Sequence, residues 1–331
     1  MAAVVALGVA CGSSSTAATQ PAAGKVQQAT KLTGDKLVLS SSQLSTIKQF
    51  SKGKLVGIVA LTMQTQYHQN LNNAAKAEAE ALGFTAQICD SATDNAKAVQ
   101  CFEGFVTQGA AAIITTSAAD TVGPAVTDAI KKGIVVIQVT GNDLGALGAV
   151  TVTVNNLTIG TSEGTGAGQY AAKQWPGKAV QVAILDYPSI PDLVARADAI
   201  QQGMLAADPN INVVGRFIGG LASNGVTSTE TALQKFPQLQ GIVGINDGGD
   251  LGGYQAMVAA GKTDANQYFV FGIDCDPQAV TYIDQGTIYK GCVDTNPSGT
   301  GKLAVDAFGQ IFSGSDVAGQ IEVPVSVHMK A

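Results

Sequence analysis

The stretch LVGIVALTMQTQYHQNLNNAAKAEAEALGFTAQIC, residues 55–89, decides the fold of this chain. It opens on an apolar run that predicts a strand over 55–61, continues with helical spacing over 67–82, and returns to a strand over 85–89. Gly83 directly follows the helical run, at the position where glycine commonly ends a helix. A strand, a helix and a second strand in this order predict neighbouring parallel strands of one sheet.

The same unit recurs along both halves of the chain. Gly109 and Gly133 end the next two predicted helices, over 95–108 and 122–132. The pattern restarts after Asn155, with helices expected around 169–173 and over 195–207, 227–236 and 251–260. Continuous apolar runs, which are typical of buried parallel strands, predict further strands. They lie at 111–115, 135–139, 150–154, 180–185, 212–218, 241–245 and 269–273. The sequence therefore predicts an α/β fold with two similar halves.

Composition narrows the function classes. The 331 residues are 46% hydrophobic and 13% charged, which suits roughly two folded domains and not a disordered chain. Net charge is −6 and the 19 Lys and Arg residues are scattered, so we expect no nucleic-acid partner. His68 and His328 are the only histidines and lie far apart in the sequence, so neither a His-based metal site nor a catalytic triad is expected.

Four of the five cysteines fall in two short-range pairs, Cys89 with Cys101 and Cys275 with Cys292. Such pairs suit disulfides in an oxidising compartment, each stabilising by roughly 3 kcal/mol through loop closure. Buried free thiols are the alternative, whereas the spacing of a zinc site is absent.

The fifth cysteine, Cys11, follows the apolar run AAVVALGVA at 2–10 and precedes a Ser/Thr/Ala/Gln-rich stretch. This order is typical of the end of a lipoprotein signal, which is cut before a cysteine that then carries the lipid. We expect residues 1–10 to be a signal remnant and 11–53 a flexible, lipid-anchored tether. The match departs from the signal pattern in two ways: Gly8 replaces the usual leucine, and no basic segment precedes the run. We expect the natural start to lie upstream of residue 1. A chance cysteine in a disordered tail is the alternative.

Glycine-rich stretches that resemble nucleotide-binding loops do not have the required spacing. Residues 164–168 lack the G-x-G-x-x-G pattern and are expected to be a helix-packing surface. Residues 299–302 resemble the end of a P-loop, but Leu303 stands where Ser or Thr would bind magnesium. Neither stretch therefore supports a nucleotide-binding loop, and we expect neither an enzyme nor a cofactor.

From Lys54 to the C-terminus the chain resembles the periplasmic sugar-binding proteins of the ribose-binding type. The likeness is carried, in the family's order, by KLVGIVAL (54–61), AAKAEAEALGF (74–84), FVTQGAAAIITTSAADTVGPAV (105–126), IVGIND (242–247), VFGIDCDP (270–277) and QGTIYKGCVDTNP (285–297). The set covers nearly the whole body of the chain.

This resemblance implies the type I fold, with two doubly wound parallel-sheet lobes joined by a three-segment hinge near 154/155, 294/295 and 323/324. The N-terminal lobe would comprise 54–154 and 295–323, and the C-terminal lobe 155–294 and 324–331. A monomer of this family closes its lobes around a sugar or polyol and delivers it to the permease of an ABC importer. The location implied is extracytoplasmic.

In the N-terminal lobe, the resemblance places ligand contacts after the strand at 55–61, at Thr65, Tyr67 and His68. Tyr67 matches a stacking aromatic of the family, whereas His68 replaces a second one. An exposed helix start is the alternative for this loop. After the strand at 135–139 the family carries an Asp-Arg pair; here Thr140 and Gly141 align with it, so the following Asn142 and Asp143 become the candidates.

In the C-terminal lobe, the resemblance assigns ligand contacts to Asn246 and Asp274, at the ends of predicted strands, and to Asp294, next to a crossing segment. Arg196 lies near the position of a ligand arginine, with a surface salt bridge as the alternative. Cys275 directly follows Asp274, so a bridge to Cys292 would fix the loop that carries this carboxylate.

Two other functions share parts of this pattern. A receptor component that presents its ligand to a membrane sensor would have the same sequence features as a transport protein. A transcriptional repressor of this fold would need an N-terminal helix-turn-helix and a basic surface, which residues 1–53 do not offer.

Overall fold

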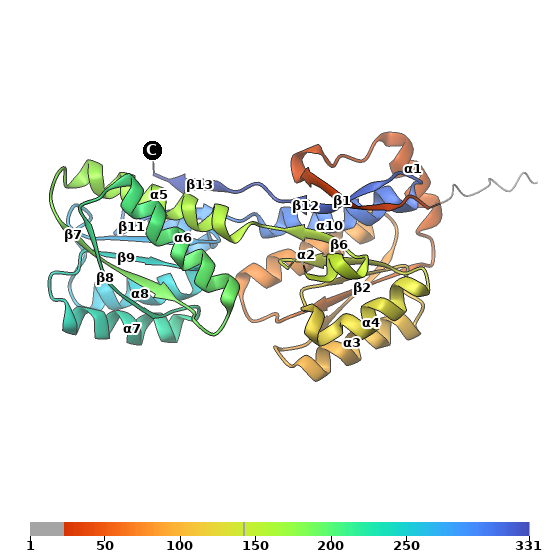
Figure 1. Ribbon diagram of the computed structural model, residues 1–331, viewed down its shortest axis with the longest axis horizontal. Coiled ribbons are helices and arrows are strands. Elements are labelled where there is room, and N and C mark those ends of the chain that lie inside the picture. The colour runs from red at the N-terminus through yellow and green to blue at the C-terminus, as the bar shows by residue number, and fades with distance from the viewer. Residues whose placement is uncertain (1–22, 142, 331) are drawn as a thin grey trace, which may run out of the picture.

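The computed structural model describes residues 23–141 and 143–330, which form two α/β lobes lying side by side (Figure 1). The N-terminal lobe is built on a seven-stranded sheet whose described pairs are all parallel. Its strands, in spatial order, are β1 (Val26–Thr33), β12 (Val317–Glu322), β6 (Val150–Thr153), β5 (Val135–Val139), β4 (Ala112–Thr115), β2 (Leu55–Ala60) and β3 (Thr85–Asp90).

Helices cover both faces of this sheet. On one face α10 (Pro297–Phe312) packs against α1 (Ser41–Phe50) and α2 (Gln66–Ala81), and on the other α3 (Asn95–Thr107) packs against α4 (Ala119–Lys131). Two 3₁₀ turns, η1 (Gly34–Lys36) and η2 (Asp143–Leu147), complete the lobe. The sheet is thus buried on both sides, as its continuous apolar strands predict.

The C-terminal lobe has a six-stranded sheet in which the edge strand β13 runs antiparallel to β11 and the other pairs are parallel. Its order is β13 (Ser326–Met329), β11 (Tyr289–Asp294), β10 (Phe269–Ile273), β9 (Gly241–Gly244), β7 (Val180–Asp186) and β8 (Ile211–Ile218). Its helices are α5 (Asn156–Gln174) packed on α6 (Pro191–Ala207), α7 (Ala222–Lys235) packed on α8 (Asp247–Ala259), and α9 (Pro277–Asp284).

Glycines explain how closely α5 and α6 approach. A Cβ added at Gly164 would lie 2.1 Å from the carbonyl oxygen of Ile200, so only glycine fits there. Gly160 and Gly168 face α6 in the same way. The stretch 164–168 is therefore a helix-packing surface, as the sequence analysis predicts.

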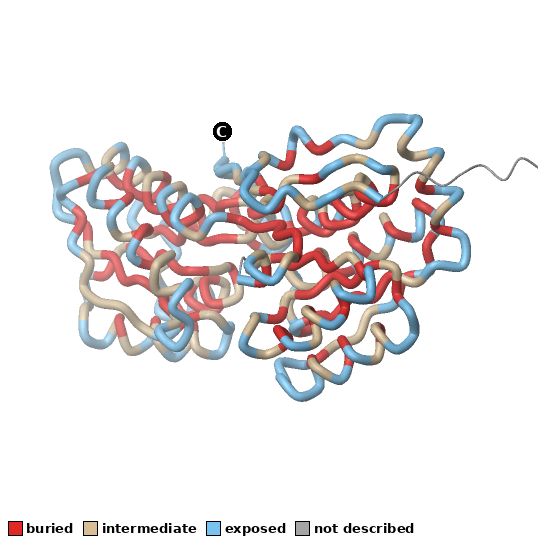
Figure 2. The backbone as a smooth tube through the Cα atoms, turned by 45° about the vertical axis from the view of Figure 1, so that its right-hand side comes forward, coloured by how far each residue is buried: buried red, intermediate tan, exposed pale blue. Residues whose placement is uncertain are grey.

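The chain crosses between the two sheets three times, at residues 154–155, 295–296 and 323–325. Val154 and Val323 are buried in these crossings and belong to one apolar cluster with strand residues of both lobes. Figure 2 shows the buried strands of each lobe as continuous red segments. Burying a Val, Leu or Ile side chain stabilises the fold by roughly 1.5–3 kcal/mol.

One expectation from the sequence is wrong. Much of the stretch assigned to a flexible tether, 11–53, is folded, because β1 pairs with β12 at the sheet edge and α1 packs on α10. Ser40 and Gln43 form a capping box at the start of α1, and Ile47 is completely buried. The apolar and polar residues of this stretch alternate only weakly, so its sequence does not predict β1 or α1.

Both expected disulfides are formed, between Cys89 and Cys101 and between Cys275 and Cys292. Cys11 lies outside the described residues. Among the described helices, none combines the length and apolar character needed to span a bilayer.

Candidate binding site between the lobes

The candidate site lies where strands of the two lobes end. Polar side chains at these ends come from the start of α2 in the N-terminal lobe and from α6 and the loops after β9 and β10 in the C-terminal lobe. Ligands of open α/β sheets bind beyond the carboxyl ends of the strands, which makes these residues the first candidates.

Three side chains from the two lobes form what we call the interlobe cluster: Tyr67, Arg196 and Asp274. Burial raises the pKa of Tyr67, the negative charge of Asp274 raises it further, and the Arg196 guanidinium opposes both effects. Electrostatic interactions weaken with distance, so the three groups lie within electrostatic range of one another. The cluster therefore brings an aromatic of one lobe into range of a cation and an anion of the other.

Arg196 is held in place by the C-terminal lobe. Its Nε donates to Oδ1 of Asn156 at 2.9 Å, and its Nη1 donates to the carbonyl of Ile245 at 2.8 Å. Within the described residues no partner is found for its Nη2. Burial lowers the pKa of Arg196, but a guanidinium with an ordinary pKa near 12.5 stays charged at neutral pH.

Asp274 directly follows β10. Its Oδ1 accepts a hydrogen bond from the Thr295 hydroxyl at 2.9 Å. Burial raises the pKa of Asp274 to about 6, although Arg196 and the Thr295 hydroxyl act in the opposite direction. The carboxylate is therefore mostly ionised at neutral pH and can accept hydrogen bonds through Oδ2.

The loop before α2 brings Thr65 and His68 beside Tyr67. Thr65 caps α2 by accepting from the backbone N–H of His68 at 3.3 Å, and its hydroxyl lies 2.7 Å from Nδ1 of that residue. Burial lowers the pKa of His68, so the imidazole is neutral at pH 7. The rings of Tyr67 and His68 meet edge to face, with 5.2 Å between centroids. The exposed helix start that was the alternative for this loop does not describe it, because Thr65, Tyr67 and His68 are all partly buried.

With this geometry in place, comparison with known proteins identifies the family. A sequence profile described as "Periplasmic binding protein domain" matches residues 56–316, most of the chain. The chain belongs to the periplasmic binding protein family. The predicted two-lobed fold of this family is confirmed.

Curated relatives of this periplasmic binding protein include ribose import binding proteins. That of Bacillus subtilis is 25% identical over 283 residues, covering 82% of this chain and 86% of the relative. That of Escherichia coli is 23% identical over 284 residues, covering 83% and 90%.

Solved structures share the fold. A solute-binding protein from Actinobacillus succinogenes with bound D-allose has a TM-score of 0.74 at 22% identity, covering 84% of this chain and 98% of that one. A Mycobacterium smegmatis solute-binding protein with bound glycerol has a TM-score of 0.71 at 24% identity, covering 84% and 94%.

Three other predicted site residues of this periplasmic binding protein make bonds within the fold. Asn246 caps α8, accepting from the N–H of Gly249 at 3.1 Å and donating to the carbonyl of Gly220 at 3.1 Å. Asp143 accepts from the N–H of Ala119 at 2.7 Å and from the Gln138 side chain, which ties η2 to α4.

Asp294 lies at the start of a crossing, where its Oδ1 accepts from the N–H of Asn296 at 2.7 Å. Asn142 lies outside the described residues. Asn246, Asp143 and Asp294 are thus engaged locally, whereas Tyr67, Arg196 and Asp274 come together.

Sequence reasoning missed the residues that support the cluster. Thr295 and Asn156 supply bonds to Asp274 and Arg196, yet each looks like an ordinary linker or helix-cap residue. Asp247 is fully buried and accepts from the hydroxyl of Tyr289 and the N–H of Asp276, both at 2.6 Å. Its position beside Asn246 is the only sequence signal for this role.

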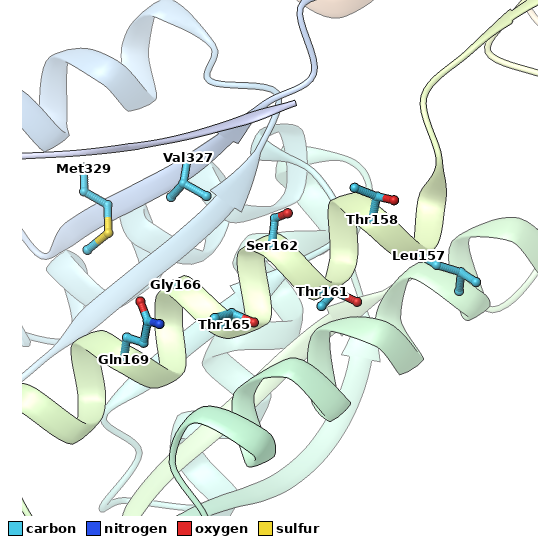
Figure 3. Close-up of a pocket in the computed structure, with 9 residues that line it drawn as sticks. All are labelled: Leu157, Thr158, Thr161, Ser162, Thr165, Gly166, Gln169, Val327 and Met329. Carbon is cyan, nitrogen blue, oxygen red and sulfur yellow. The ribbon is translucent and has the colours of Figure 1, made fainter. Parts of the chain in front are cut away.

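A groove of about 750 Å³ lies elsewhere, between α5 and β13 on the C-terminal lobe (Figure 3). None of its lining residues is charged, and none belongs to the interlobe cluster. They are Leu157, Thr158, Thr161, Ser162, Thr165, Gly166, Gln169, Val327 and Met329. Size alone therefore does not mark the binding site of this protein.

Proposed function

We propose that this protein is the extracytoplasmic solute-binding component of an ABC importer and binds a sugar or sugar-like polyol between its lobes. The observation that carries the proposal is the interlobe cluster, in which Tyr67 of one lobe lies near Arg196 and Asp274 of the other. A carboxylate accepts hydrogen bonds from hydroxyl groups and a guanidinium donates to their oxygens. An aromatic side chain supplies apolar contact area for the C–H face of a sugar.

Known relatives support this ligand class. The curated relatives are ribose import binding proteins, and solved neighbours include proteins with bound D-allose, glycerol, allitol and 5-methylthioribose. Thr140 and Gly141 replace the Asp-Arg pair that the family resemblance implies, and the carboxylate of Asp143 is used within the fold. The N-terminal lobe therefore offers fewer charged contacts than the family pattern, which favours a polyol or another small polar ligand over the standard pentose or hexose geometry.

The mechanism needs no covalent chemistry. The ligand first engages Asp274 and Arg196, and the N-terminal lobe then closes through the three crossings so that Tyr67 covers it. The closed form docks on the permease and releases the ligand there. We further propose that the protein acts as a monomer and is anchored to the membrane by lipid on Cys11; the two disulfides support a location outside the cytoplasm.

The test is a thermal-shift screen of the purified protein with D-ribose, D-allose, L-arabinose, allitol and glycerol, alongside amino acids and nucleosides. A compound present at a hundred times its Kd should stabilise the protein by about 2.7 kcal/mol. At least one sugar or polyol is expected to raise the melting temperature. A shift with amino acids and with no carbohydrate would overturn the proposed ligand class.

A further inference from the structure

The loop that carries the Asp274 carboxylate has an unusual backbone. Asp274 has φ +105° and Cys275 has φ +51°, two consecutive residues in a region that side chains other than glycine rarely adopt. Such conformations persist only where the surrounding structure enforces them, and they gather at functional sites. We call residues 274–276 the Asp274 loop.

Each residue of this loop is tied to the rest of the lobe. The N–H of Asp274 donates to the carbonyl of Val293 at 2.8 Å, and the N–H of Asp276 donates to Oδ2 of Asp247 at 2.6 Å. Between them, Cys275 is bonded to Cys292. Cys292 lies within β11 and is completely buried, so the disulfide fastens the loop to a rigid strand.

We infer that the Cys275–Cys292 disulfide is a positioning element of the binding site. It holds the Asp274 loop in the left-handed conformation and so keeps the Asp274 carboxylate in its position next to the Thr295 hydroxyl before ligand arrives. Binding is stronger when the binding groups are already ordered, because less freedom is then lost on association. The effect on affinity rests on the proposed function, whereas the effect on the loop does not.

The other disulfide provides a matched control. Cys89 and Cys101 join β3 to α3 in the N-terminal lobe, and neither has a positive φ. Removing either disulfide should lower the melting temperature, since both close loops of similar length, 12 and 17 residues in separation. Only the loss of Cys275–Cys292 should change the Asp274 loop.

The first experiment measures amide hydrogen exchange in the ligand-free protein, comparing C275A/C292A with C89A/C101A. In C275A/C292A the amides of Asp274 and Asp276 are expected to exchange at least tenfold faster, with smaller changes elsewhere in the C-terminal lobe. In C89A/C101A these two amides should be unchanged. Unchanged exchange at Asp276 in C275A/C292A, or an equal increase throughout the lobe, would overturn the inference.

A glycine variant tests the backbone argument and remains usable if the alanine variant does not fold. Glycine adopts positive φ readily, so C275G/C292A should keep the loop closer to its native conformation than C275A/C292A does. Its exchange rates at Asp274 and Asp276 are expected between those of the native protein and C275A/C292A. Faster exchange in the glycine variant than in the alanine variant would contradict a role in maintaining this backbone.

The second experiment measures the Kd of whichever of D-ribose, D-allose, L-arabinose, allitol or glycerol binds the native protein most tightly. We expect at least tenfold weaker binding in C275A/C292A and less than a twofold change in C89A/C101A. Adding C275A/C292A to D274N should cause little further loss, because the group being positioned is already altered. An equal loss of affinity in the native protein and in D274N would show that the disulfide does not act by positioning Asp274. If none of these five compounds binds, the proposed ligand class is wrong, and the exchange experiment still decides the role of the disulfide.

Discussion

Asp274 is the side chain whose protonation should govern binding. Burial raises its pKa to about 6 from an ordinary value of 3.8, while Arg196 opposes the shift and the carboxylates of Asp276 and Asp294 reinforce it. The ionised form, which accepts hydrogen bonds from hydroxyl groups, therefore predominates only above about pH 6.

Binding should accordingly weaken in acid. A group with a pKa of about 6 is roughly one-tenth ionised at pH 5, so the Kd for the tightest compound of the screen should rise about tenfold between pH 7 and pH 5. Isothermal titration calorimetry across this range checks the prediction. The D274N variant, which cannot titrate there, is the control and should bind weakly at every pH. A native Kd that stays constant from pH 7 to pH 5 would contradict the role of Asp274.

At the level of elements, α5 and α8 bring two acids together in the core of the C-terminal lobe. Glu163 and Asp250 are completely buried, and no partner for the carboxylate oxygens of Asp250 is found in the described part of the chain. Burial raises the pKa of both. The charge of Glu163 raises that of Asp250 further and Asp247 raises both, whereas Arg196 and the backbone N–H of Gly244 oppose the shift at Glu163. The folded protein therefore holds protons that the unfolded chain releases at lower pH.

The sign of the pH dependence follows from these raised pKa values. The two acids stabilise the fold fully below their ordinary pKa values near 4. This stabilisation is lost as the pH rises through their higher pKa values in the folded state. In the E163Q variant, the neutral amide can donate to Asp250 and does not titrate. Its melting temperature at pH 8 should exceed that of the native protein by on the order of 2–4 °C, with a smaller difference at pH 5. Thermal melts at both pH values test this; equal differences at both would contradict it.

The contact between α5 and α6 makes a second prediction at this scale. Gly164→Ala would place a methyl group 2.1 Å from a backbone oxygen of α6, which should destabilise the protein by about 1–3 kcal/mol through overpacking. Gly104→Ala in α3 is the matched control, because nothing lies within 4 Å of the added atom. It should be neutral or stabilising by up to about 1 kcal/mol. Chemical denaturation measures both, and equal effects would refute the packing argument.

Strong local patterns made most of these elements predictable from sequence. The apolar runs at 135–139 and 269–273 coincide with β5 and β10. Parallel strands buried on both faces have apolar residues at nearly every position, so they are easy to recognise in the sequence. β1 and α1 were missed because they pair and pack with segments from the other end of the chain, such as Val317 beside Val26. Such long-range pairing does not require a clear apolar pattern within the segment itself.

At the scale of the whole molecule, the family resemblance identified Tyr67, Arg196 and Asp274, which come from segments far apart in the sequence. It did not reveal that Asn246 and Asp143 would be used as helix caps, since a cap and a ligand contact require the same polar residue types at a strand end. Nor could it reveal Thr295 and Asn156, whose roles depend on where the crossing segments lie in space.

The central claim is that one ligand touches both lobes. The most direct measurement is calorimetric titration of the tightest compound of the screen into Y67L, D274A and the control D143A. Losing the aromatic ring of the N-terminal lobe should weaken binding about tenfold, and losing the carboxylate of the C-terminal lobe about a hundredfold. D143A should bind within about twofold of the native protein, because its carboxylate is used inside the fold. Native affinity in either Y67L or D274A would contradict a site shared between the lobes.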